Sequence, residues 1–151
     1  MSNMRNEIVE IALINAGWDN DRNINPGKLI NILKEEGYPV LDSVVEFFKE
    51  FGDLVINFEN SRNGLKDDDI NFNLEHATHV ENSERILEDY GPRIEGKVSL
   101  IGSAYRDHFC LVMSEDGKVY GGYSDFLCKI GDSGILAIET IILDYPFQEI
   151  K

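Results

Sequence analysis

The sequence predicts an α+β fold made of N-terminal helices, a central antiparallel sheet and a C-terminal helix, in a single domain that spans residues 1–151. Two changes of pattern predict it. Apolar residues recur at helical spacing in the first third of the chain, and beyond residue 52 they fall in short runs or alternate with polar residues, as in strands. Helical spacing returns only near the end. Helices and strands segregated in this way favour an α+β fold, and 151 residues is an ordinary length for one domain.

Three helices are expected before residue 52, beginning near residues 6, 25 and 42. Asn25 is an N-cap candidate with Pro26 at the first helical position. Gly17 is placed to adopt the left-handed conformation that ends a helix, and Gly37 and Gly52 end the other two. The residues expected to face the core are Ile8, Ile11, Ala12 and Ile14, then Leu29, Ile30 and Leu33, then Val44, Phe47, Phe48 and Phe51.

The middle of the chain is expected to form antiparallel strands. Residues 54–58 are a continuous apolar run, and residues 70–74 alternate apolar and polar, with a polar turn at 59–64 between them. The clearest hairpin covers residues 108–123, because an Asp-Gly pair between two apolar runs is the strongest short-range turn signal. The other elements expected are a short helix from near residue 82 to Gly91, a strand over 126–130, and a closing helix over 132–143 with Ile135, Leu136, Ile138, Ile141 and Ile142 facing the core.

Charge is the unusual feature of the composition. There are 28 Asp and Glu against 14 Lys and Arg, which gives a formal net charge of −14 and a sequence pI near 4.5. Such a field repels phosphate backbones, so direct nucleic-acid binding is not expected. It attracts a basic partner and speeds the encounter with it. An acidic surface also serves solubility alone, and the charge does not separate these two interpretations.

Half of this charge lies in about a fifth of the chain. Residues 67–95 hold nine acidic and two basic residues, a net charge of −7. This segment is either a patch that meets a basic, phosphate-binding cleft or a solvated helix face and loop. Trp and Tyr side chains would add binding anchors if they are exposed. If Trp18 is instead buried, it is expected to pack the cap of the first helix against the second helix. The candidate partner-binding residues are Asp67, Asp68, Asp69, Glu75, Glu84, Glu88, Asp89, Trp18, Tyr105 and Tyr123.

No catalytic, metal or cofactor site is expected. His76 and His79 lack a third nitrogen or sulfur ligand nearby, so we expect surface histidines. The acidic run at residues 67–69 lacks the alternating ligands and the closing Glu of a calcium loop. A Cys–His hydrolase built on His108 and Cys110 would need a base and an orienting group that the sequence does not show.

The expected location is the cytoplasm. Cys110 and Cys128 lie in apolar runs and fit no zinc motif, so both are expected to be buried and reduced. The N-terminus lacks the apolar core of a signal peptide, and no apolar run is long enough to span a bilayer. Neither a cofactor nor a membrane partner is expected. Arg22, in a chain poor in basic residues, is expected to form an internal salt bridge.

Several short blocks, spaced along nearly the whole chain, resemble the third group of the SUKH superfamily. These blocks are Gly17-Trp18 with Arg22, Gly37-Tyr38-Pro39, Phe47 through Gly52, Gly117 through Gly121, and the helix that follows Gly131-Asp132. The resemblance implies a non-enzymatic immunity protein paired with a polymorphic toxin, whose C-terminal domain is often a nuclease or deaminase. Few residues match between 58 and 96, where such proteins would diversify to fit different toxins.

The function expected is therefore to bind and neutralise the catalytic domain of a cognate secreted toxin, by steric occlusion helped by acidic complementarity. The toxin domain is expected to be basic and directed at nucleic acid. The alternative is a cytosolic regulatory or scaffold module that binds endogenous proteins. A small hydrolase is the third interpretation, and it rests only on scattered His and Asp residues.

Overall fold

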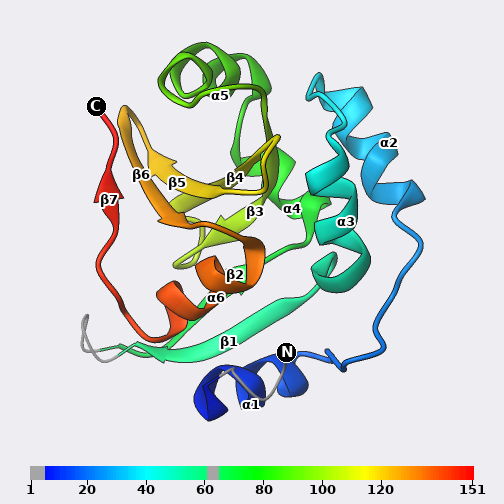
Figure 1. Ribbon diagram of the computed structural model, residues 1–151, viewed down its shortest axis with the longest axis vertical. Helices are drawn as coiled ribbons and strands as arrows, with labels where there is room; N and C mark the ends of the chain where they lie inside the picture. Colours follow the sequence, from blue (N-terminus) through cyan, green and yellow to red (C-terminus); the bar gives the residue numbers. More distant parts are fainter. Residues whose placement is uncertain (1–5, 61–64) are drawn as a thin grey trace.

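The computed structural model describes residues 6–60 and 65–151. Within them, one antiparallel sheet of seven strands follows chain order, and helices lie on both of its sides (Figure 1). The strands are β1 (Val55–Asn60), β2 (Leu65–Asn71), β3 (Val98–Ala104), β4 (Phe109–Ser114), β5 (Val119–Tyr123), β6 (Phe126–Gly131) and β7 (Gln148–Glu149). The helices are α1 (Glu7–Asn15), α2 (Gly27–Glu36), α3 (Asp42–Phe51), α4 (Leu74–Val80), α5 (Ser83–Asp89), the short 3-10 helix η2 (Gly91–Arg93) and α6 (Gly134–Ile142). This arrangement confirms the predicted α+β class.

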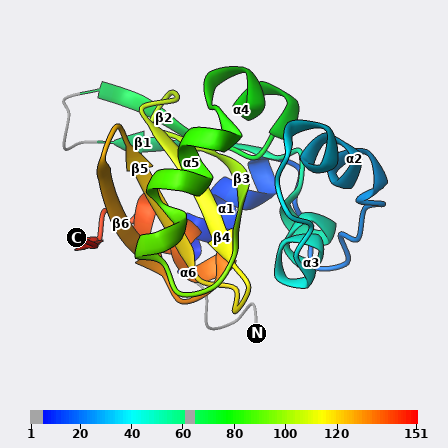
Figure 2. The ribbon, with the colours of Figure 1, turned by 90° about the horizontal axis from the view of Figure 1, so that it is seen from above.

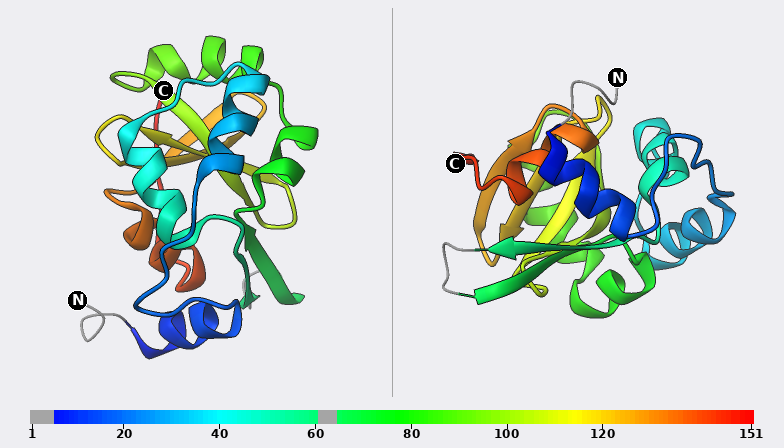
Figure 3. Two further views of the ribbon diagram at one scale, coloured as in Figure 1. Left: turned by 90° about the vertical axis from the view of Figure 1, so that its right-hand side faces the viewer. Right: turned by 90° about the horizontal axis from the view of Figure 1, so that it is seen from below.

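The sheet is the middle layer of the molecule. Helices α4 and α5 lie on one side of it, and α6 and α1 lie on the other (Figures 1 and 2). Seen from below, α1 and α6 lie side by side near β1 (Figure 3). Gly122 of β5 shows how closely the layers approach. A Cβ there would lie 2.7 Å from the Tyr90 hydroxyl at the end of α5, whereas one at the adjacent Gly121 would point to the opposite face and lie 2.6 Å from Ile130 Cδ1 of the neighbouring strand β6.

The second and third predicted helices are confirmed with their stop signals. Gly37 ends α2 with a φ of +90°, the left-handed conformation that glycine adopts without strain. All four residues of the predicted apolar stripe of α3 are buried. Gly52 ends α3 by close packing, because a Cβ there would lie 2.6 Å from Leu29 Cδ1. Tight contact between α2 and the end of α3 therefore fixes the start of β1.

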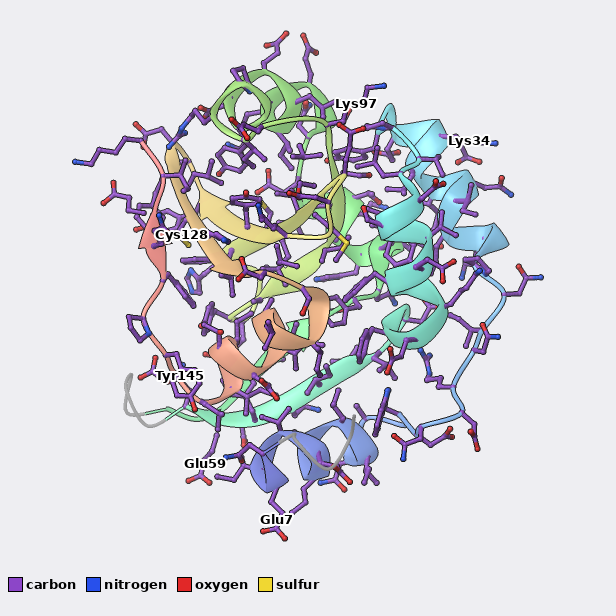
Figure 4. All side chains as sticks on the ribbon, in the orientation of Figure 1. Glu7, Lys34, Glu59, Lys97, Cys128 and Tyr145 are labelled. Carbon is purple, nitrogen blue, oxygen red and sulfur yellow. The ribbon has the colours of Figure 1, made fainter. Side chains whose placement is uncertain are left out.

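The face of α1 is the first point where the prediction is wrong. Ile8, Ile11 and Ile14 were expected to face the core, yet they are 62%, 56% and 53% exposed. The core side carries Val9, Leu13 and Ala12. The helix is apolar on nearly every side, so its sequence pattern does not select a face. Figure 4 shows Glu7 on the outward side, directed away from the body of the molecule.

The C-terminal half follows the prediction more closely. The β4–β5 hairpin forms around Gly117, whose φ is +86°. The hydroxyl of Ser133 accepts a hydrogen bond from the Leu136 amide and so caps α6. Leu136 itself, predicted to face the core, is 45% exposed. The buried residues of this helix are Ala137, Ile138, Ile141 and Ile142.

The segment after β1 differs most from the prediction. The strand expected over residues 70–74 ends at Asn71, because the Asn73 side chain accepts a hydrogen bond from the His76 amide and starts α4. Because the apolar and polar residues alternate up to residue 74, the sequence pattern did not indicate that a helix starts there.

Two strands are not predicted from the sequence. They are β3, all of whose residues are buried, and the two-residue β7. Residues 61–64 of the predicted turn lie outside the described residues. Along the described ranges, no helix has the length and apolar character needed to cross a membrane.

Candidate binding surface

Six aromatic side chains form a continuous series of ring contacts, here called the aromatic row. They come from four strands, the β3–β4 turn and the segment before β7. Neighbouring ring centroids lie 5.2 to 6.3 Å apart in tilted or edge-on arrangements, which are favourable for aromatic pairs. The members are Phe58, Tyr105, Phe109, Tyr123, Phe126 and Phe147.

Strand register places the row on the face of the sheet away from α5. Cys110 pairs with Gly122, and Tyr123 pairs with Phe126. Because side chains alternate, Phe109, Tyr123 and Phe126 share one face, while Gly122 approaches the end of α5 on the other. The row is buried at its β1 end and reaches solvent at the β5–β6 hairpin, where Tyr123 is 50% exposed. It therefore connects the core to a surface that a partner can touch.

The β3–β4 turn, which carries Tyr105 into the row, has an unusual backbone. Tyr105, Arg106 and Asp107 have φ values of 55°, 52° and 70°, three consecutive residues in the left-handed region. This conformation costs a residue with a side chain roughly 1–2 kcal/mol. Such a turn persists only where its surroundings hold it in place, and strained backbone of this kind is concentrated at functional sites.

Strand β2 holds one side of the turn. The Asp69 carbonyl accepts a hydrogen bond from the Tyr105 amide at 2.8 Å, and the Asp69 carboxylate accepts one from the Arg106 amide at 3.0 Å. The Arg106 guanidinium donates to the Asp67 carbonyl at 3.0 Å. These contacts within the chain fix the position of the backbone that carries Tyr105.

Helix α4 holds the other side. The Asp107 carboxylate accepts a hydrogen bond from the Ser103 hydroxyl at 2.8 Å and lies 2.8 Å from Nε2 of His76. In a catalytic triad the histidine lies between the serine and the aspartate. Here Asp107 lies between Ser103 and His76, so His76 cannot act as a base toward Ser103. The arrangement supports the turn and is not that of a hydrolase.

The three aspartates predicted to contact a partner have different environments. Asp68 is only 4% exposed, and its carboxylate accepts a hydrogen bond from the Asn60 side chain at 2.8 Å. Contrary to expectation, it is not at the surface. Asp69 is half-buried against the turn, and Asp67 is exposed. The acidic run therefore supplies one exposed carboxylate, that of Asp67, and one half-buried carboxylate, that of Asp69, which bonds to the turn next to Tyr105.

The glutamates of the acidic segment lie elsewhere. Glu75, Glu84 and Glu88 are exposed on α4 and α5, the helices on the far side of the sheet from the row. Asp89 pairs with Arg93 at 3.1 Å. The structure thus brings together Tyr105 and Tyr123, which both contact the Phe109 ring, while the predicted glutamates belong to a separate surface.

Trp18 and Arg22 have structural positions. Trp18 is 4% exposed, and its indole N–H donates to the Glu50 carboxylate at 3.0 Å. The Arg22 guanidinium donates to the carbonyls of Glu50 and Gly52 at 2.6 and 2.8 Å. The expected salt bridge of Arg22 is therefore replaced by hydrogen bonds that close the end of α3. Neither side chain belongs to the aromatic row.

The cysteines and histidines form no reactive group. Burial raises the pKa of the Cys110 thiol to about 12 and that of Cys128 to about 11, so both stay protonated at neutral pH. Cys128, labelled in Figure 4, lies inside the sheet near β7. His79 and His108 are exposed. In residues 6–60 and 65–151 no three His, Cys, Asp or Glu side chains are grouped as they would be to hold a metal ion.

Four members of the row are not predicted from the sequence. The sequence does contain a signal for Phe109 and Phe126. Counting residues outward from the Asp-Gly turn places Phe109 opposite Tyr123 on the neighbouring strand, and the short turn after Tyr123 places Phe126 opposite Tyr123 on its other side. Phe58 and Phe147 join the row only through the folding of distant segments, which no local pattern encodes.

The molecule is a small α+β protein, and its candidate site has the composition of a protein–protein contact surface, since aromatic residues are enriched at such contacts. The chain belongs to the SUKH-3 immunity protein family, whose model matches residues 5–144. This match confirms the resemblance seen in the sequence and extends over nearly all of the described residues. No curated protein and no solved structure is significantly similar to the chain.

Proposed function

We propose that this chain binds and neutralises the C-terminal catalytic domain of a cognate secreted polymorphic toxin. It acts in the cytoplasm as one immunity domain, by covering the toxin's active site and without chemistry of its own. Membership of the SUKH-3 immunity protein family supports the toxin as partner. It binds the toxin through the aromatic row.

The exposed end of the aromatic row is the observation that carries the proposal. Tyr and Phe are enriched at the centres of interfaces, where they bury large apolar areas with little loss of side-chain freedom. Tyr123 is half exposed, and the rings of Phe109 and Phe126 lie within 5.3 Å of it. A partner that covers Tyr123 therefore meets a rigid surface whose aromatic contacts are already formed.

Acidic side chains beside the row indicate the charge of the partner. Asp69 bonds to the backbone of Tyr105 and Arg106, the exposed Asp67 accepts from the Arg106 guanidinium through its carbonyl, and the whole chain carries a net charge of −14. Enzymes that act on nucleic acids bind phosphates through basic clefts, so a nucleic-acid-directed toxin fits this surface. Its basic cleft would be drawn toward the immunity protein and then blocked by it.

Protection of growing cells tests the proposal. The toxin-like C-terminal domain encoded beside this chain's gene is expressed in a bacterium, with or without the chain. We expect growth to stop with the domain alone and to be restored by the chain. The double variant Tyr105→Ala/Tyr123→Ala should fail to protect while accumulating to the same level. A wild-type chain that leaves killing unchanged would refute the toxin as partner and favour an endogenous protein.

A further inference from the structure

A surface cleft of about 630 Å³ lies between α3 and the first turn of α6, and the aromatic row does not use it. Its volume is in the range of sites that hold a ligand or a long side chain. Trp18, Phe47, Phe51 and Met113 form its buried base, and Glu46 and Glu50 stand at its edge.

Close packing fixes the walls of this cleft. A Cβ at Gly134, the first residue of α6, would lie 2.5 Å from the Phe47 ring, so α6 begins as near to α3 as the chain permits. The hydroxyl of Ser43 at the start of α3 donates to the Ser114 carbonyl of β4 at 2.7 Å. Close packing therefore holds in place the two helical walls of the cleft, α3 and the first turn of α6.

Three of the four charged residues of α3 are acidic, which favours a cation. Glu46 and Glu50 are four residues apart, hence on one side of the helix. The Trp18 indole N–H holds the Glu50 carboxylate at 3.0 Å. Lys49 pairs with Glu46 at 2.7 Å, but this pair is solvent-exposed, and such pairs contribute little, so another cation can replace the lysine. The Arg22 guanidinium donates to backbone carbonyls, and the Trp18 indole is neutral, so neither of these bonds brings a positive charge to the Glu50 carboxylate.

We infer that this cleft binds an arginine or lysine side chain presented by a protein partner. Carboxylates beside aromatic rings are the composition that recognises an organic cation, because the ring faces and the charges attract it together. The inference rests on the proposed function only in naming the toxin as that partner. Met113 and Phe109 share one face of β4 four residues apart, about 13 Å, so the cleft and the row lie within reach of a single partner.

Trp18 makes the test direct, because it is the single tryptophan of the chain and lies in the cleft. Its indole N–H resonance is followed in the ¹⁵N-labelled chain during titration with N-acetyl-arginine amide and with N-acetyl-lysine amide. N-acetyl-glutamine amide, a neutral compound of similar size, is the control ligand. We expect a saturable shift with both cations and none with the glutamine compound.

Two variants separate the cleft from general acidity. Glu50→Gln keeps an oxygen that can accept from Trp18 and should weaken cation binding by about tenfold. Glu84→Gln, an exposed glutamate of α5, removes the same charge elsewhere and should leave binding unchanged. Linear shifts without saturation, or equal loss in both variants, would overturn the inference. This titration contains no toxin, so absence of cation binding would overturn the inference about the cleft without contradicting the proposed function. Absence of protection against the toxin would likewise contradict the proposed function without contradicting cation binding in the cleft.

Discussion

Nε2 of His76 on α4 lies 2.8 Å from the Asp107 carboxylate in the β3–β4 turn, and this contact ties the helix on one side of the sheet to the turn that carries Tyr105 into the aromatic row. With the bonds from β2, it holds three consecutive residues in the left-handed region. The turn is thus held by contacts that come from both of its sides, and so is the Tyr105 end of the proposed binding surface.

Removing this support should loosen the turn. Asp107→Ala deletes the contacts to His76 and Ser103, so we expect the free energy of unfolding to fall by about 1 kcal/mol. The Arg106 amide should exchange its hydrogen faster. Urea unfolding and amide exchange measure the two effects. His108→Ala, in the same turn and exposed, is the control, and an equal effect from it would show that Asp107 is not the support.

The charge beside Tyr105 should act on the rate of association. Asp67→Asn/Asp69→Asn keeps an oxygen that can accept from the Arg106 amide and removes two charges. We expect association with the toxin domain to slow by about two- to tenfold at low salt and to depend less on salt. Stopped-flow mixing measures it. Glu35→Gln/Glu36→Gln, with the same change of charge on α2, is the control, and equal slowing would mean that only net charge matters.

Substitutions in α1 test which of its faces is the core. Leu13→Ala creates a cavity at a fully buried position and should lower the free energy of unfolding by about 2–5 kcal/mol. Ile11→Ala removes a side chain that is 56% exposed and should change it by less than about 0.5 kcal/mol. Chemical denaturation of both variants measures these free energies. A larger loss in Ile11→Ala than in Leu13→Ala would show that the face predicted from the sequence is the buried one.

Helix α1 shows why part of the fold cannot be predicted from the sequence. Where one side of a helix is apolar and the other polar, as in α3, the pattern identifies the buried face. In α1 both sides are apolar, and packing against the neighbouring β1 and α6 determines which side is buried. The same limit applies to β2, since its alternation continues past Asn71 although the Asn73 cap has already started a helix.

The candidate site was predictable only in part for the same reason. Tyr105 and Tyr123 lie near a hairpin with a strong turn signal, so their strands could be placed. Tyr105 contacts Phe58, and Phe109 contacts Phe147, and both contacts join residues that are distant in the chain. The burial of Asp68 depends on Asn60 across the β1–β2 pair, and a run of three aspartates gives no sign of it.

The two thiols should be unreactive in the folded protein. Burial raises the pKa of Cys110 to about 12, against an ordinary value of 9.0. Below pH 9.0 both folded and unfolded forms are protonated, so the thiol adds no pH dependence there. Above it the unfolded chain loses the proton first, and stability falls as pH rises. We expect no labelling by a thiol reagent at pH 8 until urea unfolds the chain; labelling of the folded form would contradict this burial.

The most direct test of the account is a calorimetric titration of the toxin domain encoded beside this chain's gene, in a catalytically inactive form. We expect tight binding that weakens with salt, and a loss of about thirtyfold or more in Tyr123→Ala. Tyr145→Ala, which removes a tyrosine of similar exposure that is not part of the row, should stay within about threefold of wild type. Absence of binding by the wild-type chain, or equal losses in the two variants, would contradict toxin binding through the aromatic row.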